Sequence, residues 1–263
     1  MPPVIALLTD FGTQDHYAGV MKGVMLGICP DATFVDITHD VPAHDVLVGA
    51  LELAASWRYF PPSTIFLVVV DPGVGSARRG LAAEAGDYRF VAPDNGVLTE
   101  VLRALPPGRV VELTEPRYAR PTVSRTFEGR DRFAPAAAWL ATGLELQALG
   151  GPLSDYQRLD MPLPAVTAEA VCGVVLRVDR FGNLVTNIDR RSFEATARSG
   201  TMEVTAGGHK VGRLVATYAE IQPGEICALF GSTDHLELAA NSESAADRLE
   251  LARGATIEVT RLT

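Results

Sequence analysis

The chain has 263 residues, of which 47% are hydrophobic and 21% are charged, a balance typical of a globular protein with a substantial core. Its net charge of −9 argues against a protein that binds nucleic acid through the phosphates. No apolar run approaches the roughly 20 residues that a membrane-spanning helix needs, and the N-terminus lacks a signal-peptide pattern. We therefore expect a cytoplasmic protein that binds neither nucleic acid nor membrane.

The first part of the chain alternates strand and helix patterns. Short apolar runs predict strands, and apolar residues at helical spacing predict helices. The predicted strands are Val4–Thr9, Thr33–Asp36, Ile65–Val70, Tyr88–Ala92 and Val110–Leu113. The predicted helices are Tyr17–Cys29, Val46–Trp57, Val97–Leu105 and Arg132–Thr142. This alternation predicts an α/β domain over residues 1–162, with a mostly parallel sheet covered by helices on both faces.

The pattern changes near residue 160. Met161–Val166 contains two prolines and is predicted to be a linker. Short strand patterns then follow at close spacing, separated by glycine and polar turns, which predicts a smaller all-β domain, a sandwich or a barrel, over residues 166–263. These strands are Gly173–Val178, Leu184–Ile188, Met202–Val204, Ile226–Phe230, Leu236–Ala239 and Thr256–Thr260.

Neither a disulfide framework nor a metal site is expected. The three cysteines, which are far apart and form no C-x-x-C pair, are Cys29, Cys172 and Cys227. His39-Asp40 and His44-Asp45 look like pairs of metal ligands, but their separation of five fits neither one face of a helix nor one face of a strand. We expect Asp45 to cap the helix that follows it, and His44 to line a pocket.

Three Asp-x-Gly turns follow predicted strands of the first domain: Asp10-Phe11-Gly12, Asp71-Pro72-Gly73 and Asp94-Asn95-Gly96. Ligands of open α/β sheets bind at the carboxyl ends of the strands, where a carboxylate can hold a ribose or a water. Ordinary turn chemistry is the competing interpretation, because aspartate and glycine are common in turns. The later Arg78 and Arg79 are either solvated charges or partners that orient a carboxylate.

Two turns of the second domain place an aromatic residue beside glycine and a polar residue: Phe181-Gly182-Asn183 and Phe230-Gly231-Ser232. Stacking and hydrogen bonding from such turns could recognise a nucleobase. The alternative is that these are core aromatics and plain turn residues.

A set of motifs occurs in a fixed order along the chain: Thr9–Gly12, Asp36–His39, Asp71–Ser76, Ala92–Gly96, Thr126–Pro135, Asp179–Asn183 and Gly231-Ser232. Each motif alone is weak, but the ordered set is specific. It resembles the S-adenosyl-L-methionine hydroxide adenosyltransferases, relatives of the bacterial fluorinase and chlorinase. The resemblance extends from about Val4 to Thr260.

The resemblance implies an α/β N-terminal domain, which carries the catalytic residues, and a β-barrel C-terminal domain, which contacts the nucleoside. It also implies a homotrimer, with each site between the N-terminal domain of one subunit and the C-terminal domain of its neighbour. The implied reaction converts S-adenosyl-L-methionine and water to adenosine and L-methionine by attack on the 5′ carbon. S-adenosyl-L-methionine is then the substrate, and no cofactor or metal is needed.

By position, Asp10 resembles the carboxylate that holds the ribose hydroxyls. Phe181 and Tyr218 resemble the aromatic walls, and Asp15 and Tyr17 lie where the methionine end is expected. The residues that resemble the adenine and nucleoside contacts are Asn183, Ser232, Glu237 and Ala240. His44 and Asn95 complete the predicted substrate-binding set.

The hydrolases of this family carry an Asp, Arg, His set thought to hold and activate the water. Asp71 and Arg78 match the first two, but Glu128 stands where the motif T-F-H-G-R-D has histidine. Our hypothesis is that Asp71 holds the water, Arg78 fixes the carboxylates, and Glu128 replaces the histidine as acceptor or base. The alternative is that Glu128 pairs with Arg130 or Arg132 and does no chemistry.

Two other functions remain open. One is a halogenase that makes 5′-halo-5′-deoxyadenosine, which two carboxylates near the nucleophile would disfavour because they repel a halide. The other is a non-catalytic protein that binds adenosine or S-adenosyl-L-methionine, for which the missing histidine argues. A methyltransferase is disfavoured because no glycine-rich loop follows the first strand.

Overall fold

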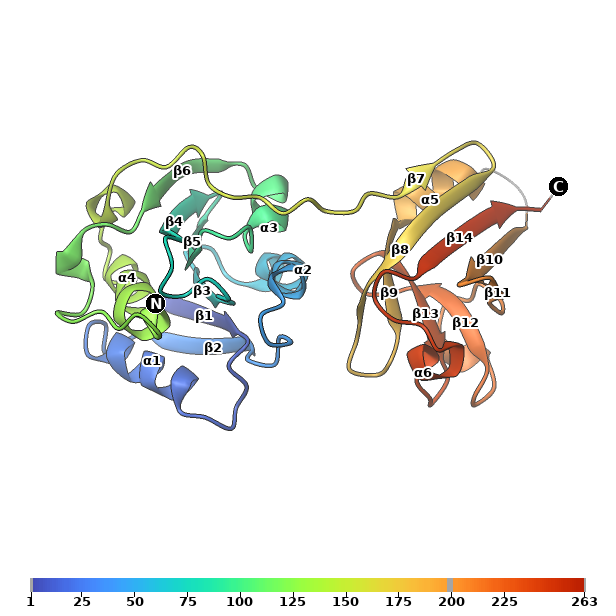
Figure 1. The fold of residues 1–263 in the computed structure, drawn as a ribbon, viewed down its shortest axis with the longest axis horizontal. Helices are drawn as coiled ribbons and strands as arrows, with labels where there is room; N and C mark the ends of the chain where they lie inside the picture. Colours follow the sequence, from blue (N-terminus) through green and yellow to red (C-terminus); the bar gives the residue numbers. More distant parts are fainter. Residues whose placement is uncertain (1, 198–200, 263) are drawn as a thin grey trace. The chain divides into compact units, whose positions relative to one another are not determined.

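The computed structural model describes residues 2–197 and 201–262. The chain divides into two compact units, with the boundary between Leu159 and Asp160 (Figure 1). Each unit has its own sheet and its own core, so each is described separately.

The first unit contains a six-stranded sheet with the order β2-β1-β3-β5-β4-β6. All neighbouring pairs from β2 to β5 are parallel, and β4 is antiparallel to both of its neighbours. The strands are β1 (Val4–Thr9), β2 (Thr33–Thr38), β3 (Ile65–Val69), β4 (Gly80–Ala85), β5 (Tyr88–Pro93) and β6 (Pro107–Glu112). The predicted mostly parallel sheet is confirmed, with β4 as an additional strand that the sequence pattern did not predict.

Helices cover both faces of this sheet, as predicted. The α-helices are α1 (Tyr17–Leu26), α2 (Val46–Ser56), α3 (Thr99–Ala104) and α4 (Ala134–Ala141), and short 3₁₀ turns span Trp57–Tyr59, Pro116–Tyr118 and Leu146–Leu149. Side chains alternate across β1: Ile5 and Leu7 belong to the core that contains residues of α1 and α4, and Ala6 and Leu8 belong to the core that contains residues of α2 and α3. Figure 1 shows α1 and α4 on one side of the sheet and α2 and α3 on the other.

The structure confirms one of the predicted helix starts in this unit and differs at another. Asp45 caps α2 as predicted, because its side chain accepts a hydrogen bond from the backbone of Val48 at 3.1 Å. The predicted helix Arg132–Thr142 differs from the structure, where a π-helical turn over Gly129–Phe133 leads directly into α4. Such turns are rare and are often found at functional sites.

The second unit contains an eight-stranded antiparallel sheet that curls around one core. Seven strands follow the order β11-β10-β14-β8-β9-β13-β12, and β7 pairs with β8. The strands are β7 (Ala165–Val166), β8 (Ala170–Val178), β9 (Leu184–Asp189), β10 (Met202–Ala206), β11 (His209–Lys210), β12 (Ile226–Phe230), β13 (His235–Ala240) and β14 (Thr256–Arg261). An isolated bridge joins Leu214 to Ala228 beyond β12.

Two expectations for this unit need correction. The predicted linker Met161–Val166 ends in β7, so its last two residues belong to the sheet. The unit is also not purely β, because it contains helices α5 (Arg190–Ala197) and α6 (Ala245–Leu249) and a 3₁₀ turn at Tyr218–Glu220. Helix α5 was missed because it is short and polar, and burial of Phe193 and Thr196 anchors it.

No helix of the described residues is both long and apolar enough to cross a membrane. All three cysteines are free; Cys29 and Cys227 are buried.

Candidate active site

Asp71 and Arg78 lie at the end of β3 and the start of β4. Arg78 donates from Nε to Asp71 Oδ1 at 2.9 Å and from Nη2 to Asp71 Oδ2 at 2.6 Å. The planar guanidinium thus binds the carboxylate through two parallel hydrogen bonds, the strongest form of this ion pair. The sequence interpretation that an arginine orients a carboxylate is confirmed for Arg78.

Glu128 is the second partner of Arg78, although it lies 50 residues further along the chain. Nη2 of Arg78 donates to Glu128 Oε2 at 2.9 Å. Glu128 immediately precedes the π-helical turn, which brings this segment to the end of β3. Glu128 thus pairs with Arg78 and not with Arg130, one of the partners expected in the alternative, because Arg130 binds the neighbouring Asp131 at 2.7 Å.

The three side chains are nearly removed from solvent, with exposed fractions of 6% for Asp71, 7% for Arg78 and 11% for Glu128. The remaining groups of Arg78 are also engaged, because Nη1 donates to the carbonyl of Arg79 at 2.7 Å. The guanidinium carbon lies 5.2 Å from the ring centroid of Phe133. Packing and hydrogen bonds therefore fix the position of the guanidinium between the two carboxylates.

The loop between Asp71 and Arg78 depends on a glycine. Gly75 has a φ of +76°, and a Cβ atom there would lie 2.2 Å from the carbonyl oxygen of Arg125. Arg125 in turn donates to the carbonyl of Gly75 at 3.1 Å. Only glycine permits this close approach, which joins the Asp71 loop to the segment that carries Glu128.

Two negative groups face one positive group in this buried cluster. Burial raises the pKa of Asp71, and the charge of Glu128 raises this pKa further, while the charge and hydrogen bonds of Arg78 lower it. The net direction is upward, so Asp71 holds a proton more readily than an ordinary aspartate. The cluster can therefore accept a proton from a group placed beside it.

Asp10 follows β1, as predicted, and its Oδ2 accepts a hydrogen bond from the backbone nitrogen of His44 at 2.8 Å. His44 has a φ of +69° and an exposed side chain, so the contribution that the structure shows is from its main chain. Gly12 donates to the carbonyl of His39 at 2.7 Å. These bonds hold the Asp10 turn against the chain that follows β2.

An aromatic cluster connects the Asp10 turn with the Glu128 segment. The ring centroid of Tyr17 lies 5.5 Å from Phe11 and 5.1 Å from Phe127, and Phe11 lies 5.9 Å from Phe127. Phe127 precedes Glu128, and Tyr17 begins α1. Asp15, predicted beside Tyr17, is exposed. Phe11 and Phe127 belong to the sequence motifs, but neither was predicted as a site residue.

The third Asp-x-Gly turn is different from the other two. The amide of Asn95 donates to the carbonyl of Val70 at 2.8 Å, and its oxygen accepts from the backbone of Val97 at 3.2 Å. Asp94 is buried and binds Arg79 and the backbone of Gln157. The side chain of Asn95 thus holds its own turn and the end of β3, while Asp94 binds residues far from the turn in the sequence.

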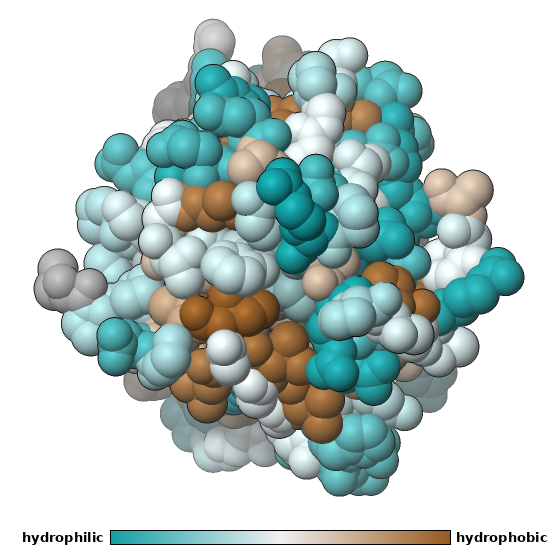
Figure 2. Space-filling model, turned by 90° about the vertical axis from the view of Figure 1, so that its left-hand side faces the viewer, coloured by the Kyte–Doolittle hydropathy of each residue, from teal (hydrophilic) through white to brown (hydrophobic). Residues whose placement is uncertain are grey.

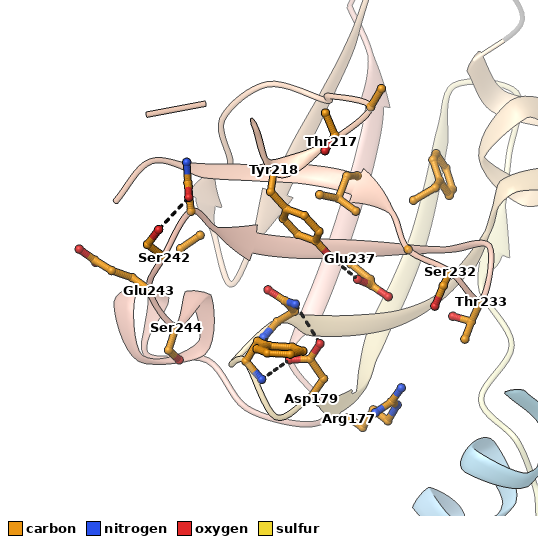
Figure 3. Close-up of a pocket in the computed structure, with 18 residues that line it drawn as sticks. Arg177, Asp179, Thr217, Tyr218, Ser232, Thr233, Glu237, Ser242, Glu243 and Ser244 are labelled. Carbon is orange, nitrogen blue, oxygen red and sulfur yellow. Dashed lines mark hydrogen bonds between the residues drawn. The ribbon is translucent and has the colours of Figure 1, made fainter. Parts of the chain in front are cut away.

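The second unit contains a pocket of about 860 Å³ (Figure 3). It brings together the predicted substrate-binding residues of the second unit, which come from the segments around β9, β12 and β13 and from the 3₁₀ turn. These lining residues are Phe181, Asn183, Tyr218, Ser232, Glu237 and Ala240.

Asp179 organises one wall of this pocket and was not predicted as a site residue. Its Oδ1 accepts hydrogen bonds from the backbone nitrogens of Phe181 at 2.8 Å and Asn183 at 2.9 Å. Its Oδ2 accepts from the side-chain amide of Asn183 at 2.9 Å (Figure 3). This turn leaves the ring of Phe181 77% exposed at the edge of the pocket, where its face is open to a ligand.

Glu237 is the buried carboxylate of the same pocket, with the hydroxyl of Tyr218 3.5 Å from its Oε2. Burial raises the pKa of Glu237, and the charge of Asp179 raises it further, against the opposing effects of Arg177 and Tyr218. A Cβ atom on Gly231 would lie 1.8 Å from Glu237 Oε1. The glycine thus makes room for the carboxyl group.

Among the described residues, no group of three or more histidine, cysteine, aspartate or glutamate side chains is arranged to hold a metal ion. The histidine–aspartate pairs of the sequence therefore form no such cluster within residues 2–197 and 201–262.

Comparison with known proteins gives matches over nearly the whole chain. Residues 5–150 match the N-terminal domain of the SAM hydroxide adenosyltransferases, and residues 173–258 match their C-terminal domain. The (R)-S-adenosyl-L-methionine hydrolase of Salinispora tropica is 38% identical over 98% of both chains, and the hydrolase of that name from Thermus thermophilus is 38% identical over 98% of this chain and 100% of its own.

More distant relatives include the fluorinase of an Actinoplanes species, which is 31% identical over 98% of both chains. The crystal structure of an uncharacterised conserved protein from Thermotoga maritima is similar, with a TM-score of 0.92 and 38% identity over 98% of this chain and 100% of its own.

Proposed function

The chain belongs to the SAM hydroxide adenosyltransferase family, and we propose that it hydrolyses S-adenosyl-L-methionine to adenosine and L-methionine. The relatives of 38% identity that are named (R)-S-adenosyl-L-methionine hydrolase support this activity. The observation that carries the mechanism is the buried cluster in which Arg78 binds both Asp71 and Glu128. S-adenosyl-L-methionine acts as the substrate, and the reaction requires no cofactor.

The proposed reaction requires the protein to position a water molecule, and it requires no covalent intermediate with the protein. The sulfonium is a good leaving group, and the water must lie roughly 3 to 3.5 Å from the 5′ carbon, on the face opposite sulfur. Asp71 holds this water through a carboxylate oxygen, and Arg78 keeps the carboxylate in one orientation. As the oxygen–carbon bond forms, the carbon–sulfur bond breaks and its electron pair leaves with methionine.

The attacking water also has to lose a proton. Asp71 and Glu128 together carry two negative charges against the single charge of Arg78, so the cluster has the capacity to take up one proton. The upward direction of the Asp71 pKa supports this role. We assign the proton to the pair of carboxylates, with Glu128 in the place where the family resemblance implies a histidine.

The pocket of the second unit is proposed to bind the nucleoside. Phe181 and Tyr218 provide aromatic faces for the adenine, and Asn183 and Glu237 provide hydrogen-bonding groups beside them. Ser232 and the main chain at Ala240 complete this set. In the first unit, Asp10 binds the ribose hydroxyls and Asp15 and Tyr17 bind the methionine end, with His44 and Asn95 supporting the Asp10 turn and the end of β3.

We further propose a homotrimer in which one subunit supplies the water-binding cluster and a neighbour supplies the nucleoside pocket. Figure 2 shows a group of hydrophobic residues surrounded by polar residues on one face. A hydrophobic patch of this kind is typical of a surface that is covered by another subunit. A solution mass of three chains by light scattering is the expected result, and a monomer that is fully active would contradict the shared site.

Chromatographic product analysis tests the activity. Purified protein incubated with S-adenosyl-L-methionine should release adenosine and methionine in equal amounts. Parallel incubations with chloride or fluoride test the halogenase alternative, which the buried carboxylates disfavour because they repel a halide. A halonucleoside product would overturn hydrolysis, and tight calorimetric binding without turnover would indicate a non-catalytic binding protein.

A further inference from the structure

Arg79 follows Arg78 directly, but its side chain points to different partners. Its Nε donates to Asp94 Oδ2 at 2.9 Å, and its Nη1 donates to Asp155 Oδ1 at 2.8 Å. Nη2 adds a hydrogen bond to the carbonyl of Asp155 at 3.0 Å. Asp94 is only 2% exposed, so one end of this arrangement is buried in the first unit, while Asp155 is 77% exposed.

The main chain of Arg79 joins this arrangement to the candidate active site. Its carbonyl oxygen accepts a hydrogen bond from Nη1 of Arg78 at 2.7 Å and another from the backbone nitrogen of Asp94 at 2.8 Å. The carbonyl therefore sets the position of one terminal nitrogen of the Arg78 guanidinium, whose other nitrogens bind Asp71 and Glu128. A shift of this carbonyl would turn the guanidinium away from both carboxylates.

The same residues fasten the last segment of the first unit. Asp94 Oδ1 accepts from the backbone of Gln157 at 2.7 Å, and the hydroxyl of Thr99 accepts from the backbone of Leu159 at 2.8 Å. Leu159 is the last residue before the unit boundary. The strap 155–159, defined by these residues, thus lies against the turn after β5 and is bound to Arg79.

We propose that Arg79 is a positioning residue for the hydrolytic site: Asp94 and Asp155 hold its side chain, and its carbonyl holds Arg78 in the orientation that binds Asp71 and Glu128. Arg79 itself touches no reacting atom in this proposal. The kinetic test of this inference rests on the proposed hydrolysis. A second test, by titration of Asp71, does not depend on activity.

The kinetic test compares Arg79→Gln and Asp155→Ala with wild type. We expect kcat to fall about tenfold in Arg79→Gln and less in Asp155→Ala, with KM almost unchanged, since a small misplacement of a catalytic group lowers the rate more than binding. The charge and hydrogen bonds of Arg78 lower the pKa of Asp71, so this pKa should rise when Arg78 is held less firmly. The acid limb of the pH–rate profile should therefore move to higher pH. Asp87→Ala removes an exposed aspartate at the opposite end of the β4–β5 hairpin and is the matched control.

A double-mutant cycle shows whether the effect passes through Arg78. In an Arg78→Lys background, where the two parallel hydrogen bonds are already lost, Arg79→Gln should have little further effect on kcat. An equal fold-change in both backgrounds would overturn the proposal. So would an Arg79→Gln variant that matches wild type in kcat and in its pH profile.

The second test measures the carboxyl of Asp71 directly. A ¹³C NMR titration should show a higher pKa for Asp71 in Arg79→Gln than in wild type and in Asp87→Ala, whether or not the protein turns over. If wild type shows no hydrolysis but this shift occurs, the proposed function fails and the positioning by Arg79 stands. If hydrolysis occurs but the titration is unchanged, the positioning proposal fails alone.

Discussion

Asp71 and Glu128 share one donor atom: Nη2 of Arg78 lies 2.6 Å from an oxygen of Asp71 and 2.9 Å from an oxygen of Glu128. The carboxylates are thus held together by a single cation, in a place where both are almost hidden from water. A buried cluster with one negative charge in excess is costly to maintain for stability alone, which favours a functional role.

Asp71→Asn should abolish most of the hydrolysis while leaving the fold intact. The amide oxygen can still accept one hydrogen bond from Arg78, but the group cannot take up a proton or hold the water as strongly. We expect adenosine release to fall at least about a hundredfold, measured by chromatography. Asp87→Asn, at an exposed turn, should behave as wild type. Turnover by Asp71→Asn within a few-fold of wild type would remove Asp71 from the mechanism.

Glu128→Gln tests whether Glu128 takes part in proton transfer. Glutamine keeps the shape and can accept a hydrogen bond from Arg78, but it cannot accept a proton, so we expect kcat to fall at least about tenfold. Glu128→His restores a group that can accept a proton and should be more active than Glu128→Gln. If the glutamine variant matches wild type, Glu128 serves only to hold Arg78.

The pH dependence of the reaction should reflect the raised pKa of Asp71. Burial is its main cause, and the neighbouring charge of Glu128 adds to it. In the proposed mechanism hydrolysis needs ionised Asp71, so kcat/KM should fall as the pH drops through a value above the ordinary aspartate pKa of about 3.9. A pH–rate profile of wild type checks this. An acid limb at or below the ordinary value would contradict it.

The free energy of unfolding should also depend on the protonation of Asp71, but in the direction opposite to that of the activity: protonation lowers the activity and favours the folded state. Because the pKa is higher in the folded protein than in the unfolded chain, the folded state binds the proton more tightly. The contribution of Asp71 to stability is therefore fully present below the unfolded pKa and is lost as the pH rises through the folded pKa. Denaturant unfolding of wild type and Asp71→Asn at several pH values should show this difference, and parallel curves would contradict it.

Gly231→Ala should disrupt the pocket proposed to bind the nucleoside. The added Cβ would overlap the carboxyl of Glu237, which is buried and has to move. We expect adenosine binding, measured by calorimetry, to weaken at least about tenfold, an effect of roughly 1.4 kcal/mol or more. Gly108→Ala, where an added Cβ meets no atom within 4 Å, is the control. Unchanged adenosine affinity in Gly231→Ala would argue that Glu237 lies outside the binding site.

The sequence predicted the layers of the first unit because its strands are apolar and its helices are amphipathic. It missed β4, whose sequence from Gly80 to Ala85 is rich in alanine, a residue that rarely indicates a strand. Pairing with β5 on one side and β6 on the other stabilises β4 regardless of this propensity. Tertiary pairing of this kind leaves no local pattern in the sequence.

The candidate site was predictable in part. The Asp71–Arg78 pair is close in sequence, so a turn could bring the two together, and the family resemblance indicated Glu128 as well. The bond between Arg78 and Glu128 could not be derived from local patterns because it spans 50 residues. The hydrogen bonds of Asp179 at the pocket of the second unit and of Asp94 at the strap also involve backbone donors that the sequence does not reveal.

The π-helical turn after Glu128 has a consequence for how this site tolerates insertions and deletions. A π turn contains one residue more than an α-helical turn, and each residue of an α-helix advances it by about 100°. Removal of one residue from Gly129–Phe133 would let α4 continue as regular α-helix towards its N-terminus, with its packed face kept against the sheet. Because the wider turn already contains this extra residue, Glu128 would keep nearly its present direction relative to α4. The same deletion within the regular turns of α4 would instead turn Glu128 by about 100° relative to the rest of the helix and away from Arg78.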